Sequence, residues 1–387
     1  MRIFVIWFQS HKKHNIPGYQ FWRNYWTNAI TEAGHEWVEA REIDWVEGLT
    51  LQGEILSQWQ ERTWYEAVKV IQYEHTLHHI DLCLSYLFPK QVLPSAIKEI
   101  QNLGIPCVNF FCDNVREFTK IPQKFFCFDL HWVPEYKALS LYREAQLNYI
   151  YAPMPVWVAP NQRSIAEVEN YGTTFIGSHD IQREILLSQV LDSNINLEIR
   201  GAGWLRLTDS LKDTEPKKLE ESSFMDMLRN QLQFIQNQGL KSWLRKLKMK
   251  LKPRVSTCDF TDFVKPSPSD TQYVKIIQES MITLGINRYP SYRYDLARPN
   301  TYSRMRDIEA PMMGACYLTE WTEGLEDLYI LGKEIETYRN VEELVDKIRY
   351  LNSSPDVRKM LRINGQKRAL AEHTISKSLA KILERVT

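Results

Sequence analysis

The chain has 387 residues, of which 44% are hydrophobic and 25% charged, a composition typical of soluble globular proteins. Its length predicts two domains of about 150–200 residues each. The 48 basic and 48 acidic residues cancel, so no global field would recruit nucleic acid. The six cysteines include no Cys-x-x-Cys pair, which argues against a zinc site and favours a reduced, cytoplasmic compartment.

Residues 1–155 alternate predicted strands and helices. An apolar run at 3–8 indicates a strand covered on both faces, and a helix at 19–33 and a strand at 36–40 follow it. Further strands are expected at 81–88, 105–111, 128–133 and 148–152, with helices at 94–103 and 136–145. This alternation predicts a doubly wound parallel sheet, whose ligands bind beyond the carboxyl ends of the strands. Trp22 and Trp26 fall on the first helix, where we expect them in the core.

No segment of the sequence predicts a membrane span or a leader. The first residues are typical of a strand, whereas a signal peptide would need a longer apolar run and a small-residue cleavage site. A run of about 18 apolar residues, as needed to span a bilayer, is missing from the sequence.

Prolines around residues 153–160 predict a linker at 156–170, followed by a second domain at 171–372. Its first strand runs into Gly177 and Ser178, and a helix at 181–191 carries Arg183 in its first turn. A second strand leads into a Gly-x-Gly turn that ends at Gly203. Glycine lets backbone N–H groups approach a phosphate, and an arginine supplies positive charge. A turn between a strand and a helix also needs no ligand, and that alternative stays open.

We expect an insertion at about residues 205–270, with a basic amphipathic helix at 239–254. One face of that helix is apolar and includes Trp243, and the other carries Lys241, Arg245, Lys248 and Lys252. The pattern is typical of a helix that lies on an anionic membrane surface. A solvated basic helix whose apolar stripe packs on its own domain would have the same pattern.

The most informative segment extends from Arg306 to Glu326. A strand ending in Asn287 and a tyrosine-rich loop at 289–300 precede it. Arg306 and Glu309 open a helix, an apolar strand from Ala315 to Thr319 follows, and Gly324, Leu325 and Glu326 form the next turn. Carboxylates bind sugar and ribose hydroxyls, and N–H groups at a helix start bind phosphate. The alternative is that Glu309 only caps a helix and the glycines only turn the chain.

This ordered run resembles the donor site of GT-B glycosyltransferases, and is most similar to the Cge-type (spore maturation protein-like) group with a glycosyl transferases group 1-type C-terminal domain. The Phe-Ile-Gly-Ser strand end, Arg183 and the Gly-x-Gly-Trp turn occur at matching places in that group. The resemblance implies two Rossmann-like doubly wound parallel-sheet domains that face a cleft. It also implies that a last helix, at 373–387, packs back on the N-terminal, acceptor-side domain.

The implied activity is transfer of a sugar from a nucleotide sugar, such as a UDP- or GDP-sugar, to a hydroxyl of a glycan or lipid-linked acceptor. The resemblance implies that Glu309 binds the donor ribose and that Arg183 and Arg306 bind the diphosphate. The remaining implied donor contacts are Gly177, Ser178, Gly203, Asn287, Gly324, Leu325 and Glu326. GT-B enzymes generally work without a bound metal or cofactor, so we expect neither.

One departure from the family pattern concerns the catalytic groups. Many retaining members carry a second glutamate eight positions before the first, and here that position is Thr301. An inverting enzyme would need a general base from the N-terminal domain. Asp113, at a strand end, is the first candidate and His11 the second. For Asp113 the alternative is an Asx-type turn cap, and for His11 an exposed loop.

Other classes of function stay open at this point. A nucleotide-sugar epimerase shares the GT-B plan, and a non-catalytic glycan-binding or coat- or envelope-assembly protein could use the same scaffold. We expect a cytoplasmic location, either free or peripheral on the inner face of the plasma membrane. No nucleic-acid partner is expected.

Overall fold

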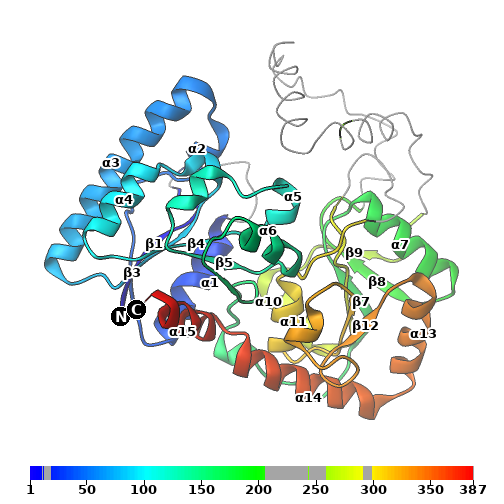
Figure 1. Cartoon of the computed structure of the whole chain (residues 1–387). Helices are drawn as coiled ribbons and strands as arrows, with labels where there is room; N and C mark the ends of the chain where they lie inside the picture. The colour runs from blue at the N-terminus through cyan, green and yellow to red at the C-terminus, as the bar shows by residue number, and fades with distance from the viewer. Residues whose placement is uncertain (11, 13–18, 205–242, 244–258, 291–298, 387) are drawn as a thin grey trace. The chain divides into compact units, whose positions relative to one another are not determined.

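The computed structural model describes residues 1–10, 12, 19–204, 243, 259–290 and 299–386. The chain divides into two compact units (Figure 1). Unit 1 comprises Met1–Trp157 and Glu372–Thr387, and unit 2 comprises Val158–Ala371. These divisions lie close to the predicted linker at 156–170 and to the predicted boundary at 372.

Unit 1 is built around a six-stranded sheet in the order β2-β1-β3-β4-β5-β6. Every neighbouring pair is parallel. Its strands are β1 (Arg2–Ile6), β2 (Glu36–Val38), β3 (Leu82–Tyr86), β4 (Cys107–Phe110), β5 (Leu130–Val133) and β6 (Tyr149–Tyr151). Its helices are α1 (Tyr19–Glu32), α2 (Glu47–Thr50), α3 (Gly53–Leu77), α4 (Pro94–Asn102), α5 (Asn114–Glu117), α6 (Leu139–Glu144) and α15 (Ile375–Val386), with short 3₁₀ turns η1 (Pro89–Gln91), η2 (Gln123–Cys127) and η3 (Tyr136–Ala138).

The apolar runs of unit 1 become strands because both faces of the sheet are covered. Every residue of β1, β3, β4 and β5 is buried. Trp26 is 1% exposed and packs edge-on against Trp132 and Phe110, and Trp22 is 6% exposed, so both belong to the core as predicted. The last helix, α15, packs against α1 and β5 within this unit.

Unit 2 repeats the plan with the strand order β12-β11-β10-β7-β8-β9, again all parallel. The strands are β7 (Tyr171–Ile176), β8 (Leu197–Arg200), β9 (Val264–Lys265), β10 (Ser280–Gly285), β11 (Tyr317–Glu320) and β12 (Glu336–Tyr338). The helices are α7 (Ile181–Asp192), α10 (Asp270–Glu279), α11 (Arg306–Met312), α12 (Leu325–Leu328), α13 (Val341–Asn352) and α14 (Pro355–Glu372), preceded by the 3₁₀ turn η4 (Pro160–Gln162). The two sheets confirm the predicted doubly wound architecture.

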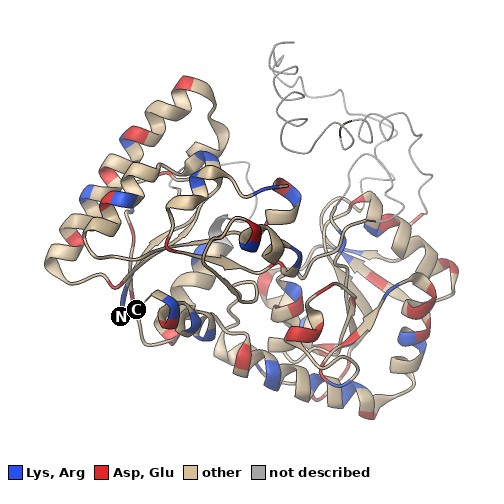
Figure 2. Cartoon of the chain, in the orientation of Figure 1, with Lys and Arg blue, Asp and Glu red and all other residues tan. Residues whose placement is uncertain are grey.

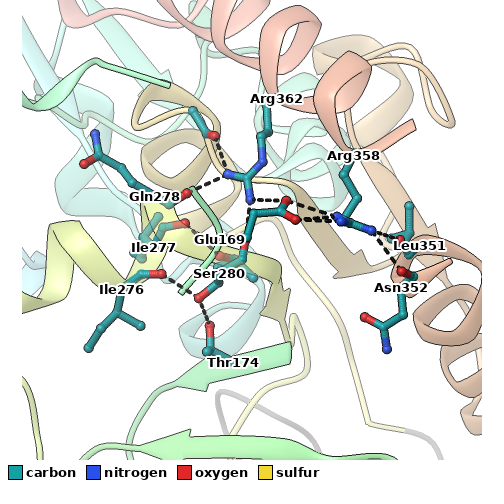
Figure 3. Close-up of polar contacts among 12 residues, drawn as sticks. Glu169, Thr174, Ile276, Ile277, Gln278, Ser280, Leu351, Asn352, Arg358 and Arg362 are labelled. Atoms are coloured by element: carbon teal, nitrogen blue, oxygen red, sulfur yellow. Dashed lines mark hydrogen bonds and ion pairs between the residues drawn. The ribbon is translucent and has the colours of Figure 1, made fainter. Parts of the chain in front are cut away.

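Charges of both signs are interspersed on the helices, and one ion-pair cluster with two buried arginines links helices of unit 2. Acidic and basic residues both occur on the described helices of each unit (Figure 2). Figure 3 shows the Glu169 carboxylate between Arg358 and Arg362 of α14, with the shortest oxygen–nitrogen distances at 2.6 and 3.1 Å. The same guanidinium groups donate to the carbonyls of Leu351 and Gln278. The cluster therefore fastens α14 to the ends of α13 and α10.

The structure adds one helix that was not predicted and corrects the bounds of two predicted segments. The long helix α3 was not predicted, although its buried residues recur at helical spacing: Trp59, Gln60, Thr63, Trp64, Ala67, Val68 and Ile71. The insertion expected at about 205–270 ends earlier, because β9 pairs with β8 and Phe260 and Val264 are in the core. The strand expected to start at Ala315 starts at Tyr317. Among the described residues, no helix is both long and apolar enough to cross a bilayer.

Candidate functional site

The carboxyl edge of the unit 2 sheet contains a topological switch point between β7 and β10. From β7 the chain passes through α7 to β8 on one side, and from β10 it passes through α11 to β11 on the other. Ligands of open parallel sheets bind where the strand order reverses in this way. The residues that begin α7 and α11 therefore flank the expected binding position, and they include Arg183, Arg306 and Glu309.

The two glycine turns at this edge are joined to each other. The backbone N–H of Gly177 donates to the backbone carbonyl of Arg200, and the Trp204 indole N–H donates to the Gly177 carbonyl, both at 2.8 Å. Gly201 has a φ of +136°, and a Cβ there would lie 2.3 Å from the Gly177 carbonyl oxygen. A Cβ on Gly203 would lie 3.1 Å from the Cβ of His179. Packing alone is therefore sufficient to explain Gly201 and Gly203, because a side chain at either position would prevent the two turns from approaching so closely. The hypothesis of phosphate binding did not include this reason.

The Arg183 side chain contacts Ser178 and Phe175 at the end of β7, and Asp180 at the start of α7. Its Nη1 donates to the Ser178 carbonyl at 2.6 Å and to the Ser178 hydroxyl at 3.1 Å. Its guanidinium lies 5.6 Å from the centroid of the Phe175 ring. Asp180 caps α7 through the Gln182 and Arg183 amides, and its second carboxylate oxygen lies 3.2 Å from Arg183 Nε. A cation at a helix N-terminus opposes the dipole, and Asp180 offsets this cost.

Asp307 joins the ends of β10 and β11 to the start of α11. It is fully buried, and it accepts from Asn287 Nδ2 at 3.0 Å, from the Tyr317 hydroxyl at 2.8 Å and from the Thr319 hydroxyl at 3.0 Å. Burial raises the pKa of Asp307, while hydrogen bonds from the Arg304 backbone and from the Tyr317, Thr319 and Ser303 side chains oppose that shift. Asn287 is also fully buried, so the structure places it beneath the edge as a support.

Glu309 and Arg306 share a partner that the sequence analysis did not identify. The Tyr273 hydroxyl, from the first turn of α10, donates to Glu309 Oε2. The Arg306 guanidinium lies 5.2 Å from the centroid of the same tyrosine ring. Glu309 is 8% exposed and Arg306 is half-buried. One aromatic side chain therefore contacts the predicted ribose-binding carboxylate and a predicted phosphate-binding cation.

Of the predicted site residues in the turn after β11, Leu325 is buried and Glu326 is exposed. Gly324 is left-handed, with φ of 89°, and precedes α12. Leu325 is fully buried, and its N–H donates to the Thr322 carbonyl at 3.3 Å. Glu326 accepts from the Trp321 indole at 2.5 Å. The side chain of Leu325 therefore serves the core, whereas Glu326 lies on the surface of this edge.

A largely buried ion pair lies next to Asn287 at the same edge of the sheet. Arg288 and Glu320 form a two-pronged pair, with Nη2 to Oε1 at 2.6 Å and Nε to Oε2 at 3.1 Å. Glu320 also accepts from the Asn287 N–H at 3.2 Å. Both residues directly follow or end a predicted strand, which is the signal that could have identified them.

In unit 1, Asp113 lies at the carboxyl end of β4, half-buried. It stands at the N-cap position of α5, yet its side chain makes no capping bond. Glu135 caps that helix instead, with Oε2 at 2.6 Å from the Asn114 nitrogen. Glu135, and not Asp113, therefore accepts from the first N–H groups of α5.

Other predicted residues lie outside the described residues. They are His11 and the basic residues of the predicted membrane-surface helix, Lys241, Arg245, Lys248 and Lys252; Trp243 of that helix is described and half-buried. Within the described ranges, no group of three or more His, Cys, Asp or Glu side chains is placed to hold a metal ion.

Solved structures share this fold at low sequence identity. Sucrose-phosphate synthase from Thermosynechococcus elongatus matches with a TM-score of 0.57 and 11% identity, over 100% of this chain and 99% of that chain. HepE from Anabaena, in complex with UDP, matches with 0.54 and 12%, over 99% and 100%. A glycosyltransferase from Rickettsia africae matches with 0.53 and 11%, over 100% and 97%. A comparison with curated protein sequences found no match.

The family follows from a sequence profile. The profile of the family described as glycosyl transferase-like matches residues 183–384, slightly more than half of the chain. That span begins at Arg183 and contains the whole segment from Asn287 to Glu326. The chain therefore belongs to the glycosyl transferase-like family, and its two parallel-sheet units are those of the GT-B fold.

Proposed function

We propose that the chain transfers a sugar from a nucleotide-sugar donor to a hydroxyl, and that unit 2 holds the donor at the switch point between β7 and β10. The observation that carries this proposal is the placement of Arg183, Arg306 and Glu309 at the starts of the two helices that flank this point. Binding of UDP by HepE, a protein of the same fold, supports a nucleoside diphosphate as the ligand.

The chemistry of these side chains assigns each of them to a different part of the donor. Arg183 and Arg306 supply positive charge for the diphosphate, which is the leaving group of the transfer. Charge that develops on the leaving oxygen is stabilised by donors already fixed in place, and Arg183 is fixed by Ser178 and Phe175. With two arginines in this role, the transfer needs no bound metal. Glu309 accepts hydrogen bonds from the ribose hydroxyls.

The proposed acceptor chemistry belongs to unit 1. For an inverting transfer, a general base must take the proton of the acceptor hydroxyl. Asp113 is our candidate because it lies three residues beyond the end of β4, at the carboxyl edge of its sheet, and because Glu135 accepts from the first N–H groups of α5. The acceptor itself is proposed to be a glycan or a lipid-linked sugar.

Membrane attachment is a separate part of the proposal and is based on the sequence of residues 239–254. Basic residues near an anionic surface contribute about 1 kcal/mol each, so the basic residues of this segment suffice for peripheral binding. Flotation with vesicles containing phosphatidylserine tests it: the chain should float with these vesicles and remain in solution with phosphatidylcholine alone. Equal behaviour with both would contradict attachment through charge.

The donor proposal is tested by a binding screen against UDP, GDP, ADP, CMP and their sugars. One nucleotide should stabilise the wild type, and Arg183→Ala and Glu309→Gln should each weaken its binding by about 30-fold, the loss of a charged hydrogen bond worth about 2 kcal/mol. Arg62→Ala, an exposed position on α3, is the matched control and should bind as the wild type does. A folded wild type that binds no nucleotide would overturn the transferase proposal and favour a non-catalytic role.

A further inference from the structure

Tyr273 connects the two groups that we assign to different parts of the donor. Its hydroxyl donates to Glu309 Oε2, and the Arg306 guanidinium lies 5.2 Å from the centroid of its ring. Arg306 and Glu309 both belong to α11, whereas Tyr273 comes from α10, more than thirty positions earlier in the chain. A side chain from a different helix therefore fixes the carboxylate and the cation relative to each other.

Helix α10, which carries Tyr273, is held in place at its start and along its length. Ser269 and Gln272 form a reciprocal capping box at the start of α10, with each side chain bonded to the backbone of the other. The body of the helix packs against β7 and β10, the strands on either side of the switch point. Tyr273 lies in the first turn of this helix, so its ring is held at the carboxyl edge of the sheet.

We propose that Tyr273 is a positioning residue for donor recognition: its hydroxyl orients Glu309 toward the ribose, and its ring orients Arg306 toward the diphosphate. This inference rests on the proposed function. A hydroxyl that donates to one carboxylate oxygen fixes the direction in which the whole carboxylate points. The face of the ring attracts the guanidinium through its charge and not through a hydrogen bond from its N–H groups.

The two contacts can be separated by substitution. Tyr273→Phe removes the hydroxyl and keeps the ring, whereas Tyr273→Leu removes both. Tyr329→Phe is the matched control, because the Tyr329 hydroxyl donates at 2.7 Å to the Asp307 carbonyl, in the same helix α11. That variant loses a buried hydroxyl bond to α11 and leaves the Glu309 contact in place.

The probes are UDP, UMP and 2′,3′-dideoxy-UDP, measured by calorimetry on the full chain. The wild type should prefer UDP over the dideoxy analogue, and this preference should fall by about 10-fold in Tyr273→Phe, the loss expected for one hydrogen bond to a charged group. Its preference for UDP over UMP should stay within about 2-fold of the wild-type value. In Tyr273→Leu the preference for UDP over UMP should also fall, by about 3-fold, because the cation loses its aromatic partner.

Each outcome decides one statement. If the wild type binds UDP and Tyr273→Phe keeps the full preference for the ribose hydroxyls, the positioning role is overturned and the proposed function stands. If Tyr329→Phe loses that preference as strongly as Tyr273→Phe does, the effect is a general loosening of α11 and the inference also fails. If the wild type binds none of UDP, GDP, ADP or CMP, the proposed function fails and this inference fails with it.

Discussion

The stability of unit 1 should depend on pH through one buried histidine. His131, on β5, is fully buried, and its ring lies 5.0–5.9 Å from the rings of Tyr142, Phe128 and Phe125. Neither ring nitrogen has a hydrogen-bond partner of normal geometry among the described residues. Burial lowers the pKa of His131 from 6.5 to about 3, and the Phe125 backbone opposes only part of this shift.

The size of the effect follows from linkage. A histidine whose pKa is lower in the folded state contributes stability that is present above the unfolded pKa and is lost as pH falls below it, because the unfolded chain binds the proton more tightly. At pH 5 the unfolded histidine is protonated and the folded one is not, so the free energy of unfolding falls by about 2 kcal/mol relative to pH 7. This value barely changes if the folded pKa is one unit higher, because either value lies below the pH of the measurement.

Urea unfolding at pH 7 and pH 5 measures the effect in the wild type and in His131→Leu. Nine of the twelve tryptophans belong to unit 1, so tryptophan fluorescence reports mainly on this unit. Between the two pH values the wild type should lose about 2 kcal/mol more than His131→Leu. His78→Gln, at an exposed position, should behave as the wild type does. An equal loss in the wild type and in His131→Leu would refute the argument that this imidazole is buried neutral.

Three further substitutions test the packing and the chemistry. Gly201→Ala should lower the free energy of unfolding by about 2 kcal/mol or more, because the new Cβ would meet a backbone carbonyl at 2.3 Å; an unchanged melting temperature would contradict this. Glu169→Gln should cost about 3 kcal/mol in urea unfolding, because two buried guanidinium groups lose their counter-charge, and a loss below about 1 kcal/mol would mean that the carbonyl bonds alone suffice. Asp113→Asn should lower kcat at least about 100-fold with little change in KM for the donor, and full activity would remove Asp113 as the base.

Much of the fold could be predicted because its strands are buried on both faces. Such strands appear in the sequence as continuous apolar runs between turn residues, and β1, β3, β4 and β5 are of this kind. The strands that escaped prediction, β9 and β12, have two and three residues. Their sequences, Val-Lys and Glu-Thr-Tyr, contain no apolar run, and these strands form because a neighbouring strand offers its edge.

The candidate site was predictable only where its residues occupy turns next to strands. Arg183, Arg306 and Glu309 lie in the first turns of helices that follow strands, so local sequence could identify them. Tyr273 has no such signal, because what distinguishes it is a contact with a residue 36 positions away. Nothing in an amphipathic helix shows which half-buried tyrosine will contact a carboxylate of another helix.

Asp307 is a second residue that supports the candidate site and that the sequence analysis did not identify. It is adjacent in sequence to a predicted site residue, yet it is fully buried. It accepts four hydrogen bonds at 2.8–3.0 Å, from the backbone N–H of Arg304 and from the side chains of Asn287, Tyr317 and Thr319. An isolated buried carboxylate would be costly, and these bonds offset that cost. Since they join β10, β11 and α11, the geometry of Arg306 and Glu309 depends on a residue that need not contact a ligand. Substitutions at Asp307 should therefore reduce stability and donor binding together, whereas those at Glu309 should reduce binding alone, and comparing the two by urea unfolding and calorimetry separates support from recognition.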